Sequence, residues 1–263
     1  MDLPHVPDSF YWTNESWGAA LRCRPLDAVA QHLFTTRRLT LETASDYEQM
    51  ARALGADDTV TVNQVHGTTV CVIRSGSEVP RGRQEADILV SNDPAVAIAV
   101  RAADCVPLLM ADRRTGAVAA VHAGWRGTAS KAAAVAVQSM RYEFGTAPLD
   151  LVVAIGPSIG ACCYQVGSDV VDAFAAAGHE RHLIERWFAT PPPPRGSFQA
   201  ERTRLRLDVA GANRDQLILA GVGEDNIHMS GLCTAMNLAL LTSFRAEKEN
   251  AGRIAGVIRC GHT

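Results

Sequence analysis

The sequence predicts an α+β protein, a layered sandwich of mixed β-sheets flanked by helices. Two apolar runs at 106–111 and 117–121, joined by the polar turn DRRTG, are typical of a β-hairpin. Residues 128–144 are rich in alanine and are followed by Gly145, which predicts a helix. The other strand-like and helix-like runs mix without a strict βαβ order, which favours an α+β fold over a doubly wound sheet.

The remaining strands are predicted from short apolar or alternating runs bounded by turn residues. Residues 59–65 alternate as a strand does and run into His66. Residues 69–73 are expected to pair back on that strand, and residues 86–90 are expected to lie beside the central hairpin. The other predicted strands are 32–37, 151–155, 227–230 and 253–260, with an edge strand and a loop within 1–30.

Helices are predicted where apolar spacing is preceded by a capping residue and followed by glycine. Ser45 and Gly55 bound the helix expected at 45–54, and Ser168 and Gly178 bound the helix expected at 168–177. Two further helices are expected at 207–221 and 234–244. The run Pro191–Pro194 predicts a surface loop that could close as a lid, because prolines do not fit a central strand.

Composition limits the classes of partner. The chain has 263 residues, and its net charge of −3 gives no basic surface for nucleic acid. The longest uncharged run, 151–168, contains glycines and a proline and so predicts a strand and a loop rather than a membrane helix. No repeat or linker interrupts the sequence. We expect a single domain over residues 1–263, with residues 1–28 as an N-terminal extension packed on it.

Compartment is predicted from cysteine usage and from the N-terminus. The seven cysteines are odd in number and irregularly spaced, which argues against a disulfide framework. The N-terminus lacks the cationic and apolar regions of a signal peptide. Both observations predict a cytoplasmic protein.

Three residues form the sharpest candidate site: His66, Cys105 and His122. If Ala111 faces Ala117 across the hairpin, Val106 lies opposite His122, and Cys105 is the next residue out. Two imidazoles and one thiolate form a three-ligand zinc set that leaves a fourth position for water or substrate. The alternative is a buried cysteine and two histidines that only bind backbone groups.

Other groups could carry chemistry as well. Cys105 could instead be a nucleophile with His122 as its base and Arg126 lowering the pKa of the thiol, and spacing does not decide between the two roles. Arg37, Arg126 and Arg245 could together bind an anion such as phosphate.

Two other motifs carry less weight. Residues 156–160 fit G-x-S-x-G, but no helix signal follows until Ser168, which disfavours a serine nucleophile. Cys162 and Cys163 are adjacent, so they cannot easily both point at one metal, and they lack C-x-x-C spacing; both are expected in the core. The zinc deaminase signature, a Walker A motif and G-x-G-x-x-G are absent from the sequence.

The segments NQVHG at 63–67, ADCVPLL at 103–109 and VHAGWRGT at 121–128 together resemble the YfiH family, also called the laccase-domain or multicopper polyphenol oxidase family. The resemblance runs from about Val29 to the C-terminus. Further matching segments are 34–37, 155–160, 164–167, 233–234 and 243–245.

The resemblance implies a zinc-dependent purine nucleoside phosphorylase with His66, Cys105 and His122 as metal ligands. Members of the family cleave adenosine, inosine, guanosine and methylthioadenosine with phosphate, and some deaminate adenosine. Copper is less favoured than zinc, since one histidine pair and one thiol cannot supply the several coppers of a laccase. A link to peptidoglycan-precursor editing and a fold similar to the cytotoxic necrotizing factor catalytic domain imply a Cys-His hydrolase as one alternative. The laccase label of the family implies a copper-dependent polyphenol oxidase as the other.

The sequence departs from the family pattern at the expected substrate rim. Arg38-Leu39-Thr40 stand where the family carries paired glycines, Phe244 replaces a tyrosine, and Ala246 replaces an arginine. We expect phosphorolysis of purine nucleosides, with no nucleic acid or membrane partner. Arg37, Arg126 and Arg245 would neutralise phosphate, and Gln64 and Asp104 would orient ligands and substrate.

Overall fold

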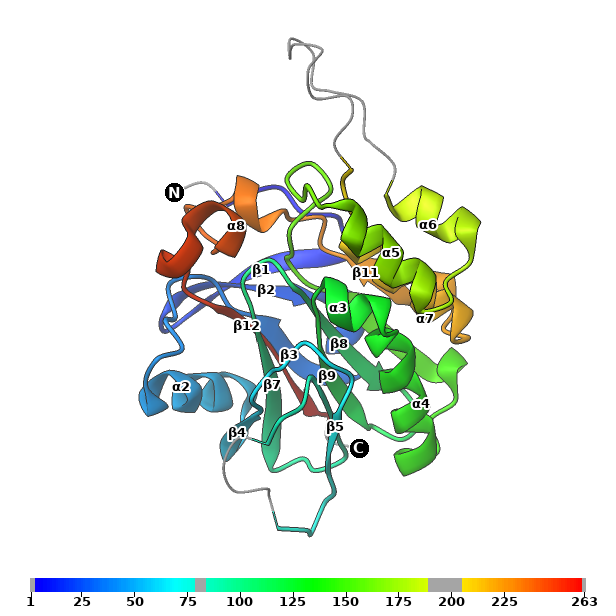
Figure 1. Cartoon of the computed structure of the whole chain (residues 1–263). Helices are drawn as coiled ribbons and strands as arrows, with labels where there is room; N and C mark the ends of the chain where they lie inside the picture. Colours follow the sequence, from blue (N-terminus) through cyan, green and yellow to red (C-terminus); the bar gives the residue numbers. More distant parts are fainter. Residues whose placement is uncertain (1–2, 79–83, 189–204, 262–263) are drawn as a thin grey trace.

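Two six-stranded sheets are stacked face to face in the computed structural model, which describes residues 3–78, 84–188 and 205–261. Both sheets mix parallel and antiparallel neighbours, and helices lie on their outer faces (Figure 1). The predicted α+β architecture with mixed sheets is therefore confirmed. The first sheet has the order β1 (Phe10–Glu15), β2 (Gly18–Cys23), β3 (Ala30–Phe34), β12 (Ile254–Cys260), β7 (Val96–Ala102) and β4 (Asp58–Thr61). The second has the order β11 (Ile227–Met229), β10 (Leu151–Ile155), β8 (Val106–Asp112), β9 (Val118–Ala123), β6 (Ile88–Ser91) and β5 (Val70–Ile73).

The helices cover the two sheets unequally. Helix α2 packs Met50 and Leu54 on the first sheet, whereas most other helices gather on the second sheet (Figure 1). The helices are α1 (Arg24–Asp27), α2 (Ala44–Leu54), α3 (Trp125–Ala129), α4 (Ala132–Phe144), α5 (Ser168–Ala176), α6 (Arg181–Trp187), α7 (Val209–Leu219) and α8 (Phe244–Glu247). Short 3-10 turns occur at Pro148–Asp150, Glu224–Asn226, Thr234–Met236 and Lys248–Asn250.

The central hairpin β8–β9 is buried on both faces. Leu108 and Met110 face the helical layer that contains α4, while Leu109 and Ala111 face the first sheet. Because both faces are covered, every residue of the two strands is buried. Apolar burial on this scale fixes the position of the hairpin and of the residues at its end.

The hairpin register differs by one residue from the predicted one. Val106 pairs with Ala123 and Pro107 pairs with His122. The reason is the turn. The N–H of Asp112 donates to the carbonyl of Ala117, so Asp112 and not Ala111 lies opposite Ala117, and the Asp112 carboxylate accepts the N–H of Thr115. Because side chains alternate along a strand, the observed register puts Cys105 on the same face as His122, where the predicted register would have separated them.

One predicted strand pairing and two predicted helices are also wrong. The strand predicted at 69–73 is β5, residues 70–73, which pairs in parallel with β6 and not with the strand before it. Residues 128–144 are divided between α3 and α4 because Lys131 adopts a left-handed backbone with φ of 64°. Residues 234–244 are not one helix. Their carbonyls at Leu238, Leu240 and Leu241 bind Arg37 instead of continuing a helical ladder.

Other predictions are confirmed at the level of the element. Strands are present near 59–61, 88–91, 151–155, 227–229 and 254–260, and Gly55 and Gly145 end α2 and α4 in the left-handed conformation. Residues 10–23 form the hairpin β1–β2, and β7 and α6 had no predicted counterpart. Pro191–Pro194 lie outside the described residues. Within the described ranges, no helix has the length and apolar character needed to span a bilayer.

Candidate metal centre

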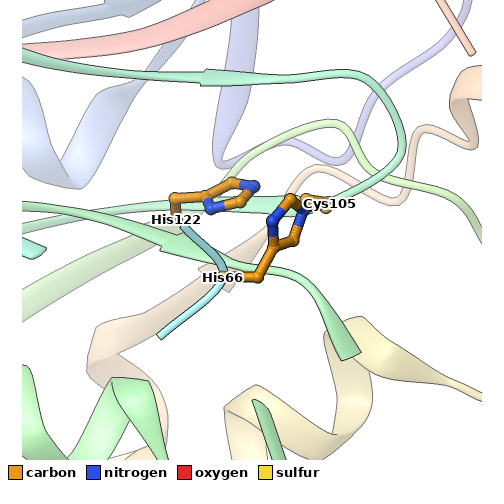
Figure 2. Close-up of side chains that lie close together, drawn as sticks. All are labelled: His66, Cys105 and His122. Carbon is orange, nitrogen blue, oxygen red and sulfur yellow. Dashed lines mark hydrogen bonds between the residues drawn. The ribbon is translucent and has the colours of Figure 1, made fainter. Parts of the chain in front are cut away.

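His66, Cys105 and His122 meet at one end of the central hairpin. His66 follows β4, Cys105 lies between β7 and β8, and His122 is on β9; their side chains point toward one another (Figure 2). One ligand atom from each residue lies within 4.8 Å of the others. The Cys105 Sγ is 3.9 Å from the His66 Nε2, and the two imidazole rings are 4.9 Å apart at 73°.

Asp87 holds this arrangement together, and sequence reasoning missed it. Its buried carboxylate lies 2.7 Å from the Nδ1 of His122. The same carboxylate accepts the backbone N–H of His66 at 3.0 Å and of Gly67 at 2.7 Å. One side chain therefore orients one imidazole and fixes the turn that carries the other, in which His66 has a φ of 63°. An acidic residue opening the apolar strand at 86–90 was the available signal.

The electrostatics favour a charged Cys105–His122 pair. Burial alone would raise the pKa of the Cys105 thiol, but hydrogen bonds and charge from His122 and His66 lower this pKa to about 6. Burial would lower the pKa of His122, but its hydrogen bonds to Asp87 and Cys105 raise this pKa to about 9. The pKa of Asp87 is held below its usual range, because the hydrogen bonds from His122 and Gly67 outweigh burial. A thiolate is the form that binds metals and attacks carbonyls.

The residues present fit a metal ion. Nitrogen and sulfur donors from three separate segments are a set that zinc and copper accept. Gly124 leaves room beside them, since a Cβ there would come within 2.8 Å of the Cys105 Sγ and 3.1 Å of the His66 Cδ2. Three close donors with space beside them can hold a metal and leave a position for a further ligand.

The site opens into a cavity of about 1060 Å³ whose wall carries cationic side chains. Arg126 and Arg245 line this cavity, as sequence reasoning expected, and Arg101 and Arg253 join them. The Nε of Arg101 is buried and has no hydrogen-bond partner among the described residues. A buried, unpartnered guanidinium nitrogen is costly unless a ligand satisfies it, so the wall suits an anion.

The third expected cation, Arg37, is not in the cavity wall. Its guanidinium forms an ion pair with Glu247 at 2.9 Å and donates to backbone carbonyls of the 238–241 segment. These contacts tie residues 238–247 to the segment that follows β3. Arg37 therefore binds protein groups, whereas Arg126 and Arg245 line the cavity.

Gln64 and Asp104 are in the cavity wall and also hold its segments in place. The Gln64 amide donates to the carbonyl of Arg101 at 2.7 Å and accepts the N–H of Arg101 at 2.8 Å. Asp104, with a φ of 84°, accepts the Thr234 hydroxyl and the N–H of Arg245, each at 2.6 Å. Both side chains are engaged by the protein itself.

Aromatic side chains complete the rim. The Arg126 guanidinium carbon lies 4.2 Å from the centre of the Trp125 ring. The Arg245 guanidinium carbon lies 5.2 Å from the centre of the Tyr164 ring. Thr40 and Phe244, two positions where the sequence departs from the family pattern, also line the cavity. The departures therefore fall at the mouth of the site.

Two other sequence interpretations have clear outcomes. Ser158 is buried and a turn, not a helix, follows it, so a nucleophile elbow is absent at this position. The expectation that Cys162 and Cys163 belong to the core is wrong, since Cys162 is exposed and Cys163 is half-buried. The loop after β10 exposes Cys162, whereas Cys163 packs against the edge of the core.

Comparison with known proteins agrees with this geometry. A family model described as multi-copper polyphenol oxidoreductase laccase matches residues 40–261. A purine nucleoside phosphorylase from Deinococcus radiodurans is 36% identical over 255 residues, which cover 89% of this chain and 91% of that protein. The adenosine deaminase RL5 from an unknown prokaryotic organism is 33% identical over 219 residues, which cover 80% of this chain and 79% of that protein.

Solved structures share the fold. The crystal structure of YlmD from Geobacillus stearothermophilus has a TM-score of 0.77 and 30% identity, covering 97% of this chain and all (100%) of that one. That of the Bacillus licheniformis hypothetical protein YfiH has a TM-score of 0.79 and 24% identity, covering 95% and 99%. The family match over most of its length and the 36% identity to the Deinococcus radiodurans protein show that the chain belongs to the laccase-like YfiH family.

Proposed function

We propose that this protein is a zinc-dependent purine nucleoside phosphorylase. It would cleave adenosine, inosine, guanosine and methylthioadenosine with phosphate and could deaminate adenosine as a second activity. The observation that carries the proposal is the convergence of His66, Cys105 and His122 at a cavity lined by four arginines. The names of relatives, purine nucleoside phosphorylase and adenosine deaminase, support it.

In this proposal each part of the site has a role. His66, Cys105 and His122 would hold zinc, which supplies Lewis acidity toward an oxygen of phosphate or water. Arg101, Arg126 and Arg245 would bind the phosphate dianion and place it against the anomeric carbon of the nucleoside. An oxygen of hydrogen phosphate forms the new bond to that carbon while the bond to the purine nitrogen breaks. The proton that the hydrogen phosphate gives up goes to the leaving purine, so the products are the sugar phosphate dianion and the neutral base. Preorganised cations and fixed positions supply the rate enhancement.

The supporting residues act through others. Gln64 would keep the backbone of Arg101 in place, and Asp104 would do the same for Arg245. Trp125, Tyr164 and Phe244 offer aromatic faces on which a purine can stack. These residues would set which nucleoside is preferred.

The test is purine release from inosine and adenosine with and without phosphate, followed by chromatography of base and sugar products. Release of base with sugar phosphate, only when phosphate is present, supports phosphorolysis; release without phosphate, or deamination alone, contradicts it. Metal content of protein purified without added metal, and its loss in His66→Ala and Cys105→Ala, tests the zinc assignment. A preparation with one zinc per chain that leaves every nucleoside intact would sink the proposal.

A second candidate is a Cys-His hydrolase acting on an amide, such as a peptidoglycan precursor. It is favoured by one observation, the Cys105 thiolate beside a His122 whose Nδ1 faces Asp87, which is the order of groups in a thiol triad. Amide cleavage that survives stripping of the metal but is lost in Cys105→Ser would support this route. The predicted likeness to the cytotoxic necrotizing factor domain remains a prediction.

A copper-dependent phenol oxidase is the least supported alternative. Among the described residues, one mixed histidine and cysteine group and one cysteine group could hold a metal, which is short of the histidines that a multicopper site needs. Oxidation of a phenol by protein that contains copper as purified would favour it. The proposed partners remain purine nucleosides and phosphate. The proposed compartment remains the cytoplasm.

A further inference from the structure

A second group of thiols lies on the loop that follows β10. The Sγ atoms of Cys162, Cys163 and Cys233 all lie within 4.8 Å of one another, and those of Cys162 and Cys163 are 3.6 Å apart. Cys162 is exposed and Cys233 is buried, so the group spans from the surface inward. None of the three is a ligand or nucleophile in the proposed reaction.

Backbone contacts hold this group in place without any ligand. The loop runs parallel to residues 232–234, with the N–H of Ser158 donating to the carbonyl of Leu232 and that of Thr234 donating to Ser158. The N–H groups of Cys163 and Tyr164 both donate to the carbonyl of Gly160, which closes the turn. The thiols are therefore brought together by main-chain hydrogen bonds, and little ordering entropy remains to be lost on binding an ion.

Space and charge at the group suit a cation. A Cβ on Gly160 would lie 3.3 Å from the Cys162 Sγ and 3.6 Å from the Cys233 Sγ, so glycine leaves the inner side open. The N–H of Gly160 donates to the Cys233 Sγ at 3.3 Å, and the Arg206 guanidinium donates to the carbonyl of Cys162. The Gly160 donor favours negative charge on the Cys233 sulfur, and Arg206 fixes the backbone of the turn that carries Cys162.

When no ion is bound, burial and the close sulfurs oppose negative charge on Cys162 and Cys163. Burial and the neighbouring sulfurs raise the pKa of Cys163 to about 12 and also raise the pKa of Cys162. Three thiolates cannot accumulate so close together unless a cation compensates their charge. A soft ion that forms bonds to sulfur removes this repulsion and releases the protons.

The ligand count selects the kind of ion. Metal–thiolate bonds of about 2.3 Å place the sulfurs of a trigonal shell about 4 Å apart, which agrees with the observed group. Zinc takes a fourth ligand, and no histidine or carboxylate among the described residues joins the three sulfurs. Monovalent copper prefers soft sulfur ligands and is satisfied by a trigonal shell.

We propose that Cys162, Cys163 and Cys233 form a second metal site, a trithiolate that binds one monovalent copper ion independently of the His66–Cys105–His122 centre. Three S–H bonds are broken, three copper–sulfur bonds form and three protons are released, with no change in oxidation state. Copper binding at this site does not depend on the proposed phosphorolysis.

The test uses the full chain, reduced and kept without oxygen, titrated with monovalent copper against bicinchoninate. Cys105→Ala serves as the parent, because it weakens the first centre. In this background we expect the protein to retain one copper ion. Cys162→Ser or Cys163→Ser should weaken copper binding at least tenfold. Cys71→Ser, which replaces a thiol elsewhere in the core, should leave the copper affinity unchanged. Cys162 is exposed, so its replacement leaves folding and purine release unchanged in the otherwise wild-type chain.

X-ray absorption on the copper-loaded Cys105→Ala protein supplies the second readout. A shell of three sulfurs supports the site, and nitrogen in the shell overturns it. Equal retention of copper in the Cys162→Ser and parent proteins also overturns it. So does preferential filling by zinc with a fourth ligand.

Discussion

The carboxylate of Asp87 and the imidazole of His122 face each other at 2.7 Å in the interior, and the backbone N–H of His122 also donates to the carbonyl of Asp87 at 2.8 Å. This double contact fixes both the ring and the strand that carries it. It also assigns the Nε2 atom of His122 to the side facing Cys105. The electrostatics of the whole centre follow from this pair.

Replacing Asp87 with asparagine tests its role. We expect Asp87→Asn to weaken metal binding and purine release about 10- to 100-fold, because the imidazole loses its charged partner. Metal affinity by competition with a chromophoric chelator gives the measurement. Asp112→Asn is the matched control, since Asp112 is equally buried and holds backbone N–H groups at the opposite end of the hairpin. Equal loss of metal in both variants would mean that Asp87 acts only on stability.

A methyl group at Gly124 should fill the space for the ion. The backbone of Gly124, with φ of −72° and ψ of 176°, accepts alanine. We expect Gly124→Ala to remain folded and lose metal, because its Cβ would lie 2.8 Å from the Cys105 Sγ. Gly127→Ala is the control, since its Cβ would meet neighbours only at 3.4 Å or more. Full metal content in Gly124→Ala, measured by mass spectrometry of the metal, would contradict this geometry.

The arginines should separate into two kinds. Arg101→Gln is expected to raise the KM for phosphate tenfold or more, since a charge-assisted hydrogen bond contributes about 1.5–3 kcal/mol. Arg37→Gln should leave that KM unchanged and lower the melting temperature instead, because Arg37 binds Glu247 and backbone carbonyls. Steady-state kinetics over a range of phosphate concentrations decides the matter. An unchanged KM in Arg101→Gln would remove Arg101 from the phosphate site.

Metal-free protein should contain one unusually acidic thiol. Alkylation of Cys105 by iodoacetamide is expected to follow a midpoint near pH 6, because His122 and His66 stabilise the thiolate despite its burial. Cys162, whose pKa is raised by burial, should react only at higher pH. Peptide mapping after brief labelling distinguishes the two cysteines. A Cys105 midpoint at or above that of Cys162 would refute the charged pair.

His32 should make folding sensitive to acid. Its Nε2 accepts the N–H of Cys23 at 2.8 Å inside the first sheet, and burial lowers its pKa to about 3. The unfolded chain binds the proton first, so this stability is complete above pH 6.5 and is lost as the pH falls from 6.5 toward 3.

The measurement is urea unfolding of the wild type and of His32→Gln at pH 7.5 and pH 5. The advantage of the wild type should shrink by about 2 kcal/mol between these values, from about 1.4 kcal/mol per pKa unit. A constant difference between the two proteins would show that His32 does not carry the acid sensitivity.

Local patterns determined much of this protein. Alternation and apolar runs identified most strands, and glycines identified the ends of α2 and α4, because backbone conformation depends on neighbours in the sequence. The three metal-ligand candidates also followed from sequence, since each ends a strand or a turn. The predicted hairpin brought Cys105 near His122, but in a register that puts their side chains on opposite faces, and it did not place His66.

Only the tertiary structure decided the rest. The register of β8 and β9, the pairing of β5 with β6, and the diversion of Arg37 to Glu247 depend on contacts between segments far apart in the chain. The same is true of Asp87 beside His122 and of Cys233 beside Cys162. Sequence thus determined which chemical groups are available and where chain elements begin and end. Long-range packing, which no local pattern encodes, decided which of those groups share a site.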